Sequence, residues 1–113
     1  MKLTIALDAT DGAARTGSIA TARGVLPTPL FMPVGTRASV KALDAADLEA
    51  LGIPLILANT YHLMLRPGSP LIADLGGLHR FMDWPGHVLT DSGGFQIFSL
   101  EPKVTDDGAT FRS

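Results

Sequence analysis

The chain has 113 residues, of which 46% are hydrophobic and 18% are charged, so it is too apolar for a disordered segment and long enough for one globular domain. Nine Lys and Arg residues against eleven Asp and Glu residues give a net charge of -2, which excludes a sequence-wide basic field for nucleic-acid phosphates. The chain contains no cysteine, which excludes disulfides and thiolate metal ligands.

Neither a membrane span nor a signal peptide is expected. No apolar run reaches the length of about eighteen residues that a spanning helix needs. Asp8 and Asp11 interrupt the stretch in which a signal-peptide core would lie. The sequence therefore predicts a cytoplasmic chain with no membrane partner.

The first predicted element is an antiparallel β-hairpin. Residues 2–10 and 17–22 both alternate apolar and polar side chains, and Asp11-Gly12 marks the connection between them. We therefore assign residues 1–28 to an N-terminal β-hairpin region.

A buried strand and a helix are predicted next. Residues 30–35 form a short apolar run that ends in glycine and is too brief for a helix. Asp44 can cap a following helix, Asp47 then stands at the third helical position, and Gly52 ends the helix. Its expected packing face consists of Ala45, Leu48 and Leu51.

The same order of strand and helix then repeats. Residues 53–58 predict a second buried strand that ends at Asn59. A second helix is expected with Ser69 as its cap and Pro70 at its first position. It would bury Leu71, Ile72 and Leu75 and stop at Gly76-Gly77. Residues 87–90 predict a third strand that leads to Asp91.

This order of elements predicts an α/β fold, the N-terminal part of a TIM (β/α)8 barrel preceded by a β-hairpin. Gly35, Asn59 and Asp91 would share the edge where the parallel strands end, and they are 24 and 32 residues apart. The spacing is near the ~31 residues per unit of an eight-unit barrel. An open doubly wound sheet gives similar local patterns, but its glycine-rich dinucleotide fingerprint is missing after the first strand. Residues 29–113 would form the first β-α units.

The stretch from Asp91 to Phe95 is the main candidate for chemistry. A carboxylate at a strand end can accept or donate a proton, and Gly93 and Gly94 allow a ligand to approach the backbone closely. The same tetrapeptide also forms tight turns that begin with aspartate. Asn59, at the tip of the neighbouring strand, is the second candidate.

Asp-Ser-Gly-Gly also surrounds the nucleophile of trypsin-like serine proteases, with Ser92 as the attacking hydroxyl. That motif has Gly before the Asp and Pro after the glycines, whereas Thr90 and Phe95 stand here. Those proteases are all-β proteins with disulfides, so the lack of cysteine excludes them too.

Four motifs in order resemble the bacterial tRNA-guanine (queuine) transglycosylases. They are residues 31–36 (FMPVGT), 59–63 (NTYHL), 66–68 (RPG) and 90–96 (TDSGGFQ). The resemblance runs from about Arg15 to Ser113. It implies a TIM-barrel glycosyltransferase of queuosine biosynthesis that exchanges guanine at the anticodon wobble position of tRNA for 7-aminomethyl-7-deazaguanine. Its implied partners are the tRNA anticodon loop and these two bases.

The resemblance also implies roles for particular residues. Asp91 matches the aspartate that manages protons on the departing and arriving bases, as a general acid/base and proton acceptor. Phe95 occupies the position of the aromatic ring that stacks on the base. Asp91, Ser92, Gly93, Gly94, Phe95 and Asn59 would bind substrate.

Other parts of the family's site match nothing in this chain. The nucleophilic aspartate and the zinc ligands, three Cys and one His, are expected beyond residue 113. No metal site or cofactor is therefore expected within the chain, the isolated chain is expected to be inactive, and a homodimer is implied only for the full length. A non-catalytic partner subunit and a truncated remnant of the family remain alternatives. An intact acid at position 91 favours the enzyme.

Overall fold

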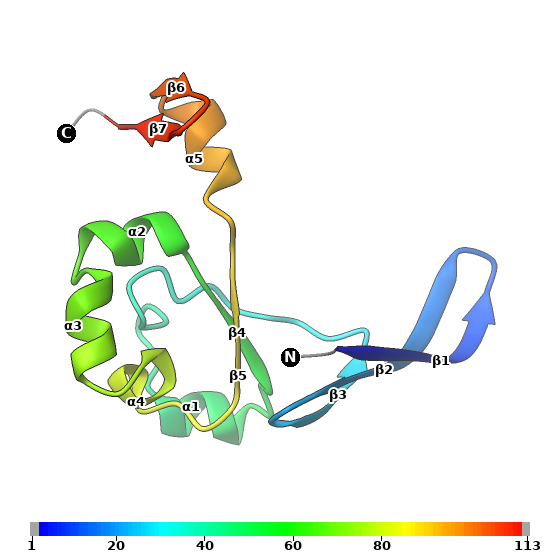
Figure 1. Cartoon of the computed structure of the whole chain (residues 1–113). Helices are drawn as coiled ribbons and strands as arrows, with labels where there is room; N and C mark the ends of the chain where they lie inside the picture. Colours follow the sequence, from blue (N-terminus) through cyan, green and yellow to red (C-terminus); the bar gives the residue numbers. More distant parts are fainter. Residues whose placement is uncertain (1–2, 112–113) are drawn as a thin grey trace.

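The computed structural model describes residues 3–111 and shows a mixed α/β chain with three separate sheets (Figure 1). Its strands are β1 Thr4–Asp11, β2 Ala14–Thr21, β3 Gly24–Thr28, β4 Leu55–Ala58, β5 His87–Thr90, β6 Lys103–Thr105 and β7 Gly108–Thr110. Its helices are α1 Ala45–Ala50, α2 Thr60–Leu65, α3 Ser69–Asp74, α4 Leu78–Met82 and α5 Gly94–Ser99. The radius of gyration is 16.5 Å, against about 13 Å for a compact domain of this length, so the elements are spread out.

The N-terminal sheet has the strand order β1-β2-β3 and is antiparallel throughout. The predicted hairpin is confirmed as β1 and β2, but the prediction missed β3. Gly24 and Pro27 disguise this strand, because both residues usually mark turns. Pro27 is tolerated because β3 lies at the edge of the sheet, where one side of the backbone needs no partner. In Figure 1 this sheet extends from one side of the helices as an arm.

The centre of the chain is the parallel pair β4 and β5, with α1 to α4 in the same body (Figure 1). The strand predicted at residues 30–35 is wrong in its extent, because only Val34 bridges to Leu57. Around it, the Pro33 carbonyl accepts from the Leu57 N–H over 2.9 Å and the Gly35 N–H donates to the Leu57 carbonyl. Pro33 has no N–H of its own, so the pairing cannot extend as a regular ladder.

Two helices match the predicted helices closely. Helix α1 carries the expected capping box, in which the Asp44 side chain accepts from the Asp47 N–H over 2.9 Å and Asp47 returns the bond over 3.0 Å. Helix α3 begins one residue earlier than predicted: Gly68 is the N-cap, so Ser69 is already helical. It ends at Asp74 with Leu75 as the C-cap, and the expected Gly76 and Gly77 follow with positive φ.

The buried side chains form two small clusters between these helices and β4. One contains Leu48, Ile56 and Trp84, and the other contains Ala38, Ala58 and Leu63. The prediction that Leu51, Leu71 and Leu75 are buried is wrong, since they are 64%, 46% and 47% exposed. Each helix has only five or six residues, so it covers the strands with a narrow strip of its surface.

The sequence reading missed α2, α4, α5 and the β6–β7 hairpin. None of these helices has a cap hydrogen bond from the side chain of its own N-cap residue, so the usual local start signals are absent. Among residues 3–111, no helix combines the length and the hydropathy that crossing a membrane requires.

Candidate active site

The register of the two central strands places Asn59 and Asp91 side by side. Leu55 pairs with His87 and Ala58 pairs with Thr90, so Asn59 and Asp91 are the next residues on each strand. The Asp91 N–H continues the ladder by donating to the Ala58 carbonyl over 3.3 Å. Gly35 pairs with Leu57 just before this point. The expected convergence at the carboxyl ends of the strands is therefore present in the structure.

Three hydrogen bonds hold Asp91 against the start of α2. The Asn59 side-chain amide donates to Oδ2 over 2.8 Å, and the Thr60 N–H donates to Oδ1 over 2.7 Å. The Thr60 hydroxyl donates to the Asp91 main-chain carbonyl over 2.5 Å. Both carboxylate oxygens thus have a partner, and the main chain of Asp91 is fixed as well. We call this arrangement the Asp91 clamp.

The clamp exchanges the usual roles at the start of a helix. Asn59 is the N-cap of α2, a position where Asn normally accepts from an N–H of the first turn. Its side chain makes no such bond and donates to Asp91 instead. The Asp91 carboxylate accepts from the Thr60 N–H in its place, so a residue 31 positions away caps the helix.

The clamp lowers the pKa of Asp91 below its ordinary value. The largest cause is the hydrogen bond from Asn59, and the N–H groups of Thr60 and Gly93 add to it, while partial burial opposes the shift. All of these donors stabilise the charged form. At neutral pH the group at this strand end is therefore a carboxylate, a proton acceptor rather than an acid.

The residues after Asp91 lie in a turn that leads into α5. The Ser92 Oγ accepts from the Gly94 N–H over 3.3 Å. Gly93 is buried with φ of 72°, where a side chain would be strained and its Cβ would meet the Tyr61 side chain at 3.8 Å. Phe95 is 73% exposed, so one face of its ring is free to stack on a ligand.

Sequence reasoning missed Thr60 and Tyr61. Tyr61 packs against Phe111 with a centroid distance of 4.7 Å and ring planes tilted by 57°, so it connects α2 to the C-terminal part of the described residues. The sequence signal for Thr60 is a hydroxyl residue close after a predicted buried strand. This signal identifies Thr60 only if a helix is known to begin there, because the helix provides the free N–H that donates to Asp91.

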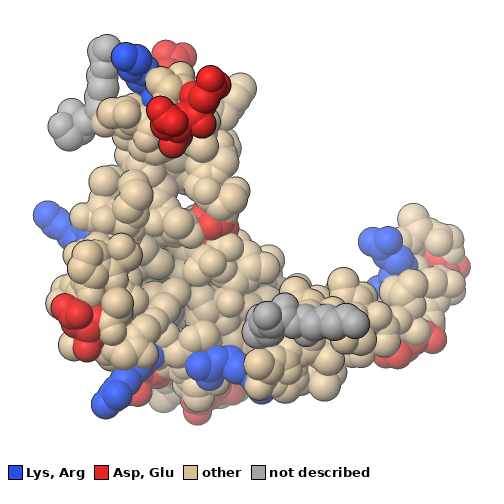
Figure 2. Space-filling view, in the orientation of Figure 1, with Lys and Arg blue, Asp and Glu red and all other residues tan. Residues whose placement is uncertain are grey.

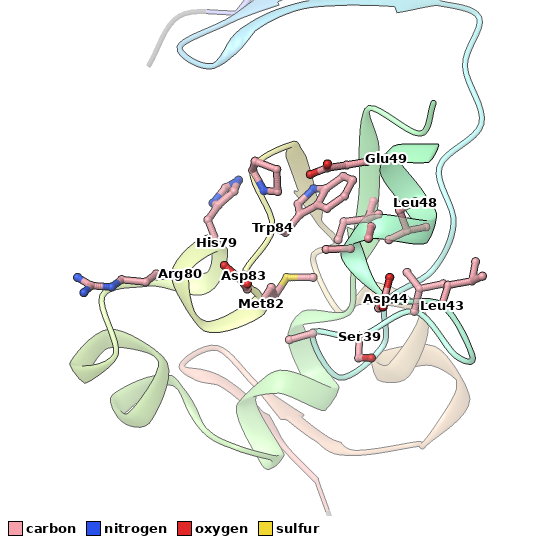
Figure 3. Close-up of a pocket in the computed structure, with 16 residues that line it drawn as sticks. Ser39, Leu43, Asp44, Leu48, Glu49, His79, Arg80, Met82, Asp83 and Trp84 are labelled. Carbon is pink, nitrogen blue, oxygen red and sulfur yellow. The ribbon is translucent and has the colours of Figure 1, made fainter. Parts of the chain in front are cut away.

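Two cavities lie in the described part of the chain, and only the smaller one reaches the clamp, through Thr60. A cavity of about 930 Å³ lies between α1 and α4 and is lined by His79, Glu49 and Trp84 among others (Figure 3). A smaller, almost wholly apolar cavity of about 480 Å³ is lined by α2, α3 and Thr90. Neither is lined by Asp91 or Asn59. We therefore place the candidate site at the Asp91 clamp and not in the larger cavity, because neither Asp91 nor Asn59 lines that cavity.

Neither metal ligands nor a continuous basic track lies near the clamp. Within residues 3–111, no three His, Cys, Asp or Glu side chains come close enough to hold a metal ion, so these residues do not fit a zinc ion. Figure 2 shows blue and red side chains scattered around the rim of one face with a broad uncharged surface between them. On this face, charge does not provide a path for a phosphate backbone.

A parallel strand pair with a hydrogen-bonded carboxylate at its carboxyl end defines an α/β protein with a strand-end site. The family model for queuine tRNA-ribosyltransferase matches residues 9–113, so the chain belongs to that family. It is 57% identical over 112 residues to a queuine tRNA-ribosyltransferase of Herpetosiphon aurantiacus and 58% identical over 115 residues to one of Granulibacter bethesdensis. These alignments cover 97% and 100% of this chain, but only 29% and 30% of the two relatives, whose N-terminal portion it matches.

Proposed function

We propose that this chain forms the N-terminal part of the catalytic barrel of a tRNA base-exchanging transferase. The observation that carries the proposal is the Asp91 clamp at the carboxyl end of β5, in a chain that belongs to this family. In the proposed reaction, guanine at the anticodon wobble position of tRNA is replaced by 7-aminomethyl-7-deazaguanine. Residues 1–28 would precede the barrel, and residues 29–113 would supply its first β-α units.

Asp91 would transfer the protons of this exchange. The departing guanine must gain a proton and the arriving base must lose one, and a carboxylate beside the base can serve both needs. Because its pKa is lowered, Asp91 rests as a carboxylate, so it must take up a proton from solvent before it gives one to the departing guanine. It would then take a proton from the arriving ring and release it to solvent, and loss of the Asn59 hydrogen bond would raise the pKa and make Asp91 a stronger base and a weaker acid.

The neighbouring residues would bind and orient the base. Phe95 offers an exposed ring, and stacking of a base on such a ring contributes about 1–3 kcal/mol. Gly94 is exposed and leaves the backbone accessible after the strand, Gly93 supplies the positive φ of the turn, and Ser92 holds the turn. Asn59 and Thr60 act through Asp91, so we describe them as positioning residues.

The rest of the chemistry belongs to segments that the relatives have and this chain does not match. The attack on ribose and any bound zinc would be supplied there, and a homodimer would form from the full-length chains. The proposed location is the cytoplasm, where tRNA is modified. A non-catalytic partner subunit would not need a carboxylate held by two donors, so the clamp favours the catalytic lineage.

A chimera tests the proposal. This chain would replace the matching 30% of the Granulibacter bethesdensis relative, and incorporation of labelled guanine into tRNA would be measured. Asp91→Asn should lower the exchange by about 10²–10⁴-fold, while the chimera loses the small stabilisation that the carboxylate gives and stays folded at the assay temperature. Asp74→Asn, the same change at an exposed position on α3, should leave both exchange and stability unchanged. Near-normal incorporation by Asp91→Asn would refute the assignment.

A further inference from the structure

The N-terminal sheet meets the helical body at the start of β5, at the opposite end of this strand from the Asp91 clamp. Two side-chain hydrogen bonds connect them: Thr21 Oγ1 lies 2.9 Å from His87 Nε2, and Arg23 Nη1 donates to the Pro85 carbonyl over 3.5 Å. We call these residues, together with His79, the junction. The proposed function does not use any of them.

Several hydrogen bonds of the junction meet at the Thr21 hydroxyl. Thr21 Oγ1 has one hydrogen, which it donates to the Gly24 carbonyl over 3.1 Å. The same oxygen accepts from the Arg23 N–H over 3.0 Å and lies 2.9 Å from His87 Nε2. When His87 carries a proton on Nε2, its ring donates to this oxygen while the Thr21 hydroxyl donates to Gly24.

The main chain of His87 is fixed at the same place. Its N–H donates to the Pro54 carbonyl over 2.9 Å, and its carbonyl accepts from the Trp84 indole over 2.9 Å. Trp84 is 4% exposed and is the only tryptophan in the sequence. A change at the junction would therefore alter the surroundings of a single fluorescent side chain.

His79, on α4, is the unusual member of the junction. The Gly86 carbonyl accepts a hydrogen bond from its ring, and its other nitrogen, Nε2, is buried without a partner among the described residues. A proton added to Nε2 would have no acceptor there. The pKa of His79 is lowered, and burial is the largest cause. The charge of Arg23 lowers the pKa further and that of His87 lowers it slightly, whereas the hydrogen bond to Gly86 opposes the shift.

The other charged groups around His79 come from the elements that line the large cavity. They are Asp44 and Glu49 beside or on α1, and Arg80 and Asp83 on or directly after α4 (Figure 3). None of these carboxylates is among the groups that shift the pKa of His79. Within the described residues, the charges that act on this ring are thus positive.

We propose that the junction is an acid-sensitive latch, in which protonation of His79 releases the N-terminal sheet from the helical body. The added charge lies on a half-buried ring whose Nε2 has no acceptor among the described residues, and repulsion from Arg23 and His87 weakens the two hydrogen bonds that join the N-terminal sheet to the helical body. His79 is harder to protonate when the N-terminal sheet is docked on the helical body. The docked state therefore keeps its full stability at a pH above 6.5, the ordinary pKa of histidine. The equilibrium constant for docking falls as the pH drops below 6.5, by up to about tenfold for each unit by which docking lowers the pKa of His79.

Hydrogen exchange on the chimera described above, and the contribution of Trp84 to its fluorescence, measured between about pH 8 and about pH 5, test the latch. After correction for intrinsic exchange rates, amides of β2 and β3 should lose protection below pH ~6.5 while those of β4 and β5 keep theirs. The Trp84 signal should change over the same range. Unchanged protection of β2 and β3 at about pH 5 would overturn the proposal.

Two variants identify the residue responsible. His79→Gln cannot gain a charge and should abolish the acid step, whereas His62→Gln on α2 should retain it. If His79→Gln does not fold, Arg23→Gln replaces it: removal of that charge should raise the pKa of His79, read by NMR, and make the acid step smaller. An acid step that is unaltered in Arg23→Gln, or persists in His79→Gln, would refute the latch.

Discussion

The Asn59 amide donates to the Asp91 carboxylate over 2.8 Å, which joins the tips of two strands whose residues are 32 positions apart in the sequence. This bond is the main reason why the pKa of Asp91 is low. Asn59→Ala should therefore raise that pKa, because the charged form loses a donor. Thr60→Val keeps its N–H bond and should raise it less.

Carbon NMR of the Asp91 carboxyl group during an acid titration measures both shifts. The lowered pKa stabilises the fold at a pH above the ordinary value of Asp and ceases to do so as the pH falls through the lowered value. The acid loss of stability should thus be smaller in Asn59→Ala. An unchanged pKa in Asn59→Ala would show that the clamp does not tune Asp91.

Phe95→Ala in the chimera should weaken binding of the base and leave proton transfer intact, since it removes a stacking surface. A loss of about 1–3 kcal/mol corresponds to a roughly 5- to 160-fold rise in the Kd for guanine. Phe98→Ala removes the same ring from the same helix at a position that is 85% exposed, and it should have little effect. A collapse of kcat with unchanged affinity for the base would contradict the stacking role.

Gly17→Ala should destabilise the N-terminal sheet. A Cβ at this position would lie 2.1 Å from the Ala6 carbonyl oxygen, next to the shift in register between Leu7 and Ala9, so the backbone would have to move. We expect a loss of about 1–3 kcal/mol in urea unfolding. At Gly35 the nearest atom would be 3.5 Å away, so Gly35→Ala is the matched control and should cost much less. Equal effects would contradict the steric explanation.

The isolated chain should unfold with low cooperativity, bind ANS and perform no base exchange. Leu3, Ile5 and Leu7 of the N-terminal sheet are 54%, 71% and 63% exposed, and Leu89 of β5 is 41% exposed. Addition of the remaining part of a relative should lower ANS binding and restore exchange. Exchange by the chain alone that depends on Asp91 would overturn the proposed function, and a sharp unfolding transition without ANS binding would refute the predicted low stability.

The parts of the fold that could be predicted are those with strong local signals. Asp44 and Asp47 define α1, and the apolar runs before Asn59 and Asp91 define the two central strands. Helix α2 could not be recognised in the same way, because its cap comes from a residue on another strand. No local sequence pattern records such a contact.

The candidate site shows the same limit. The pairing of Asn59 with Asp91 follows from the expectation that parallel strands end at one edge, so their proximity was predictable. The lowered pKa and the part played by Thr60 depend on hydrogen-bond geometry that the order of residues does not specify. Phe95 was identified through the family motif alone, and its stacking role remains a prediction.

The parallel pairing of β4 with β5 also constrains the order in which the chain folds. The two strands are separated by residues 59–86, which include three helices, whereas β1 and β2 are joined by two residues. Hairpins close in about 1–10 μs, but a parallel pair must wait until its long connection has collapsed. The β1–β2 hairpin should therefore form early, and Asn59 should meet Asp91 only in the last stages of folding.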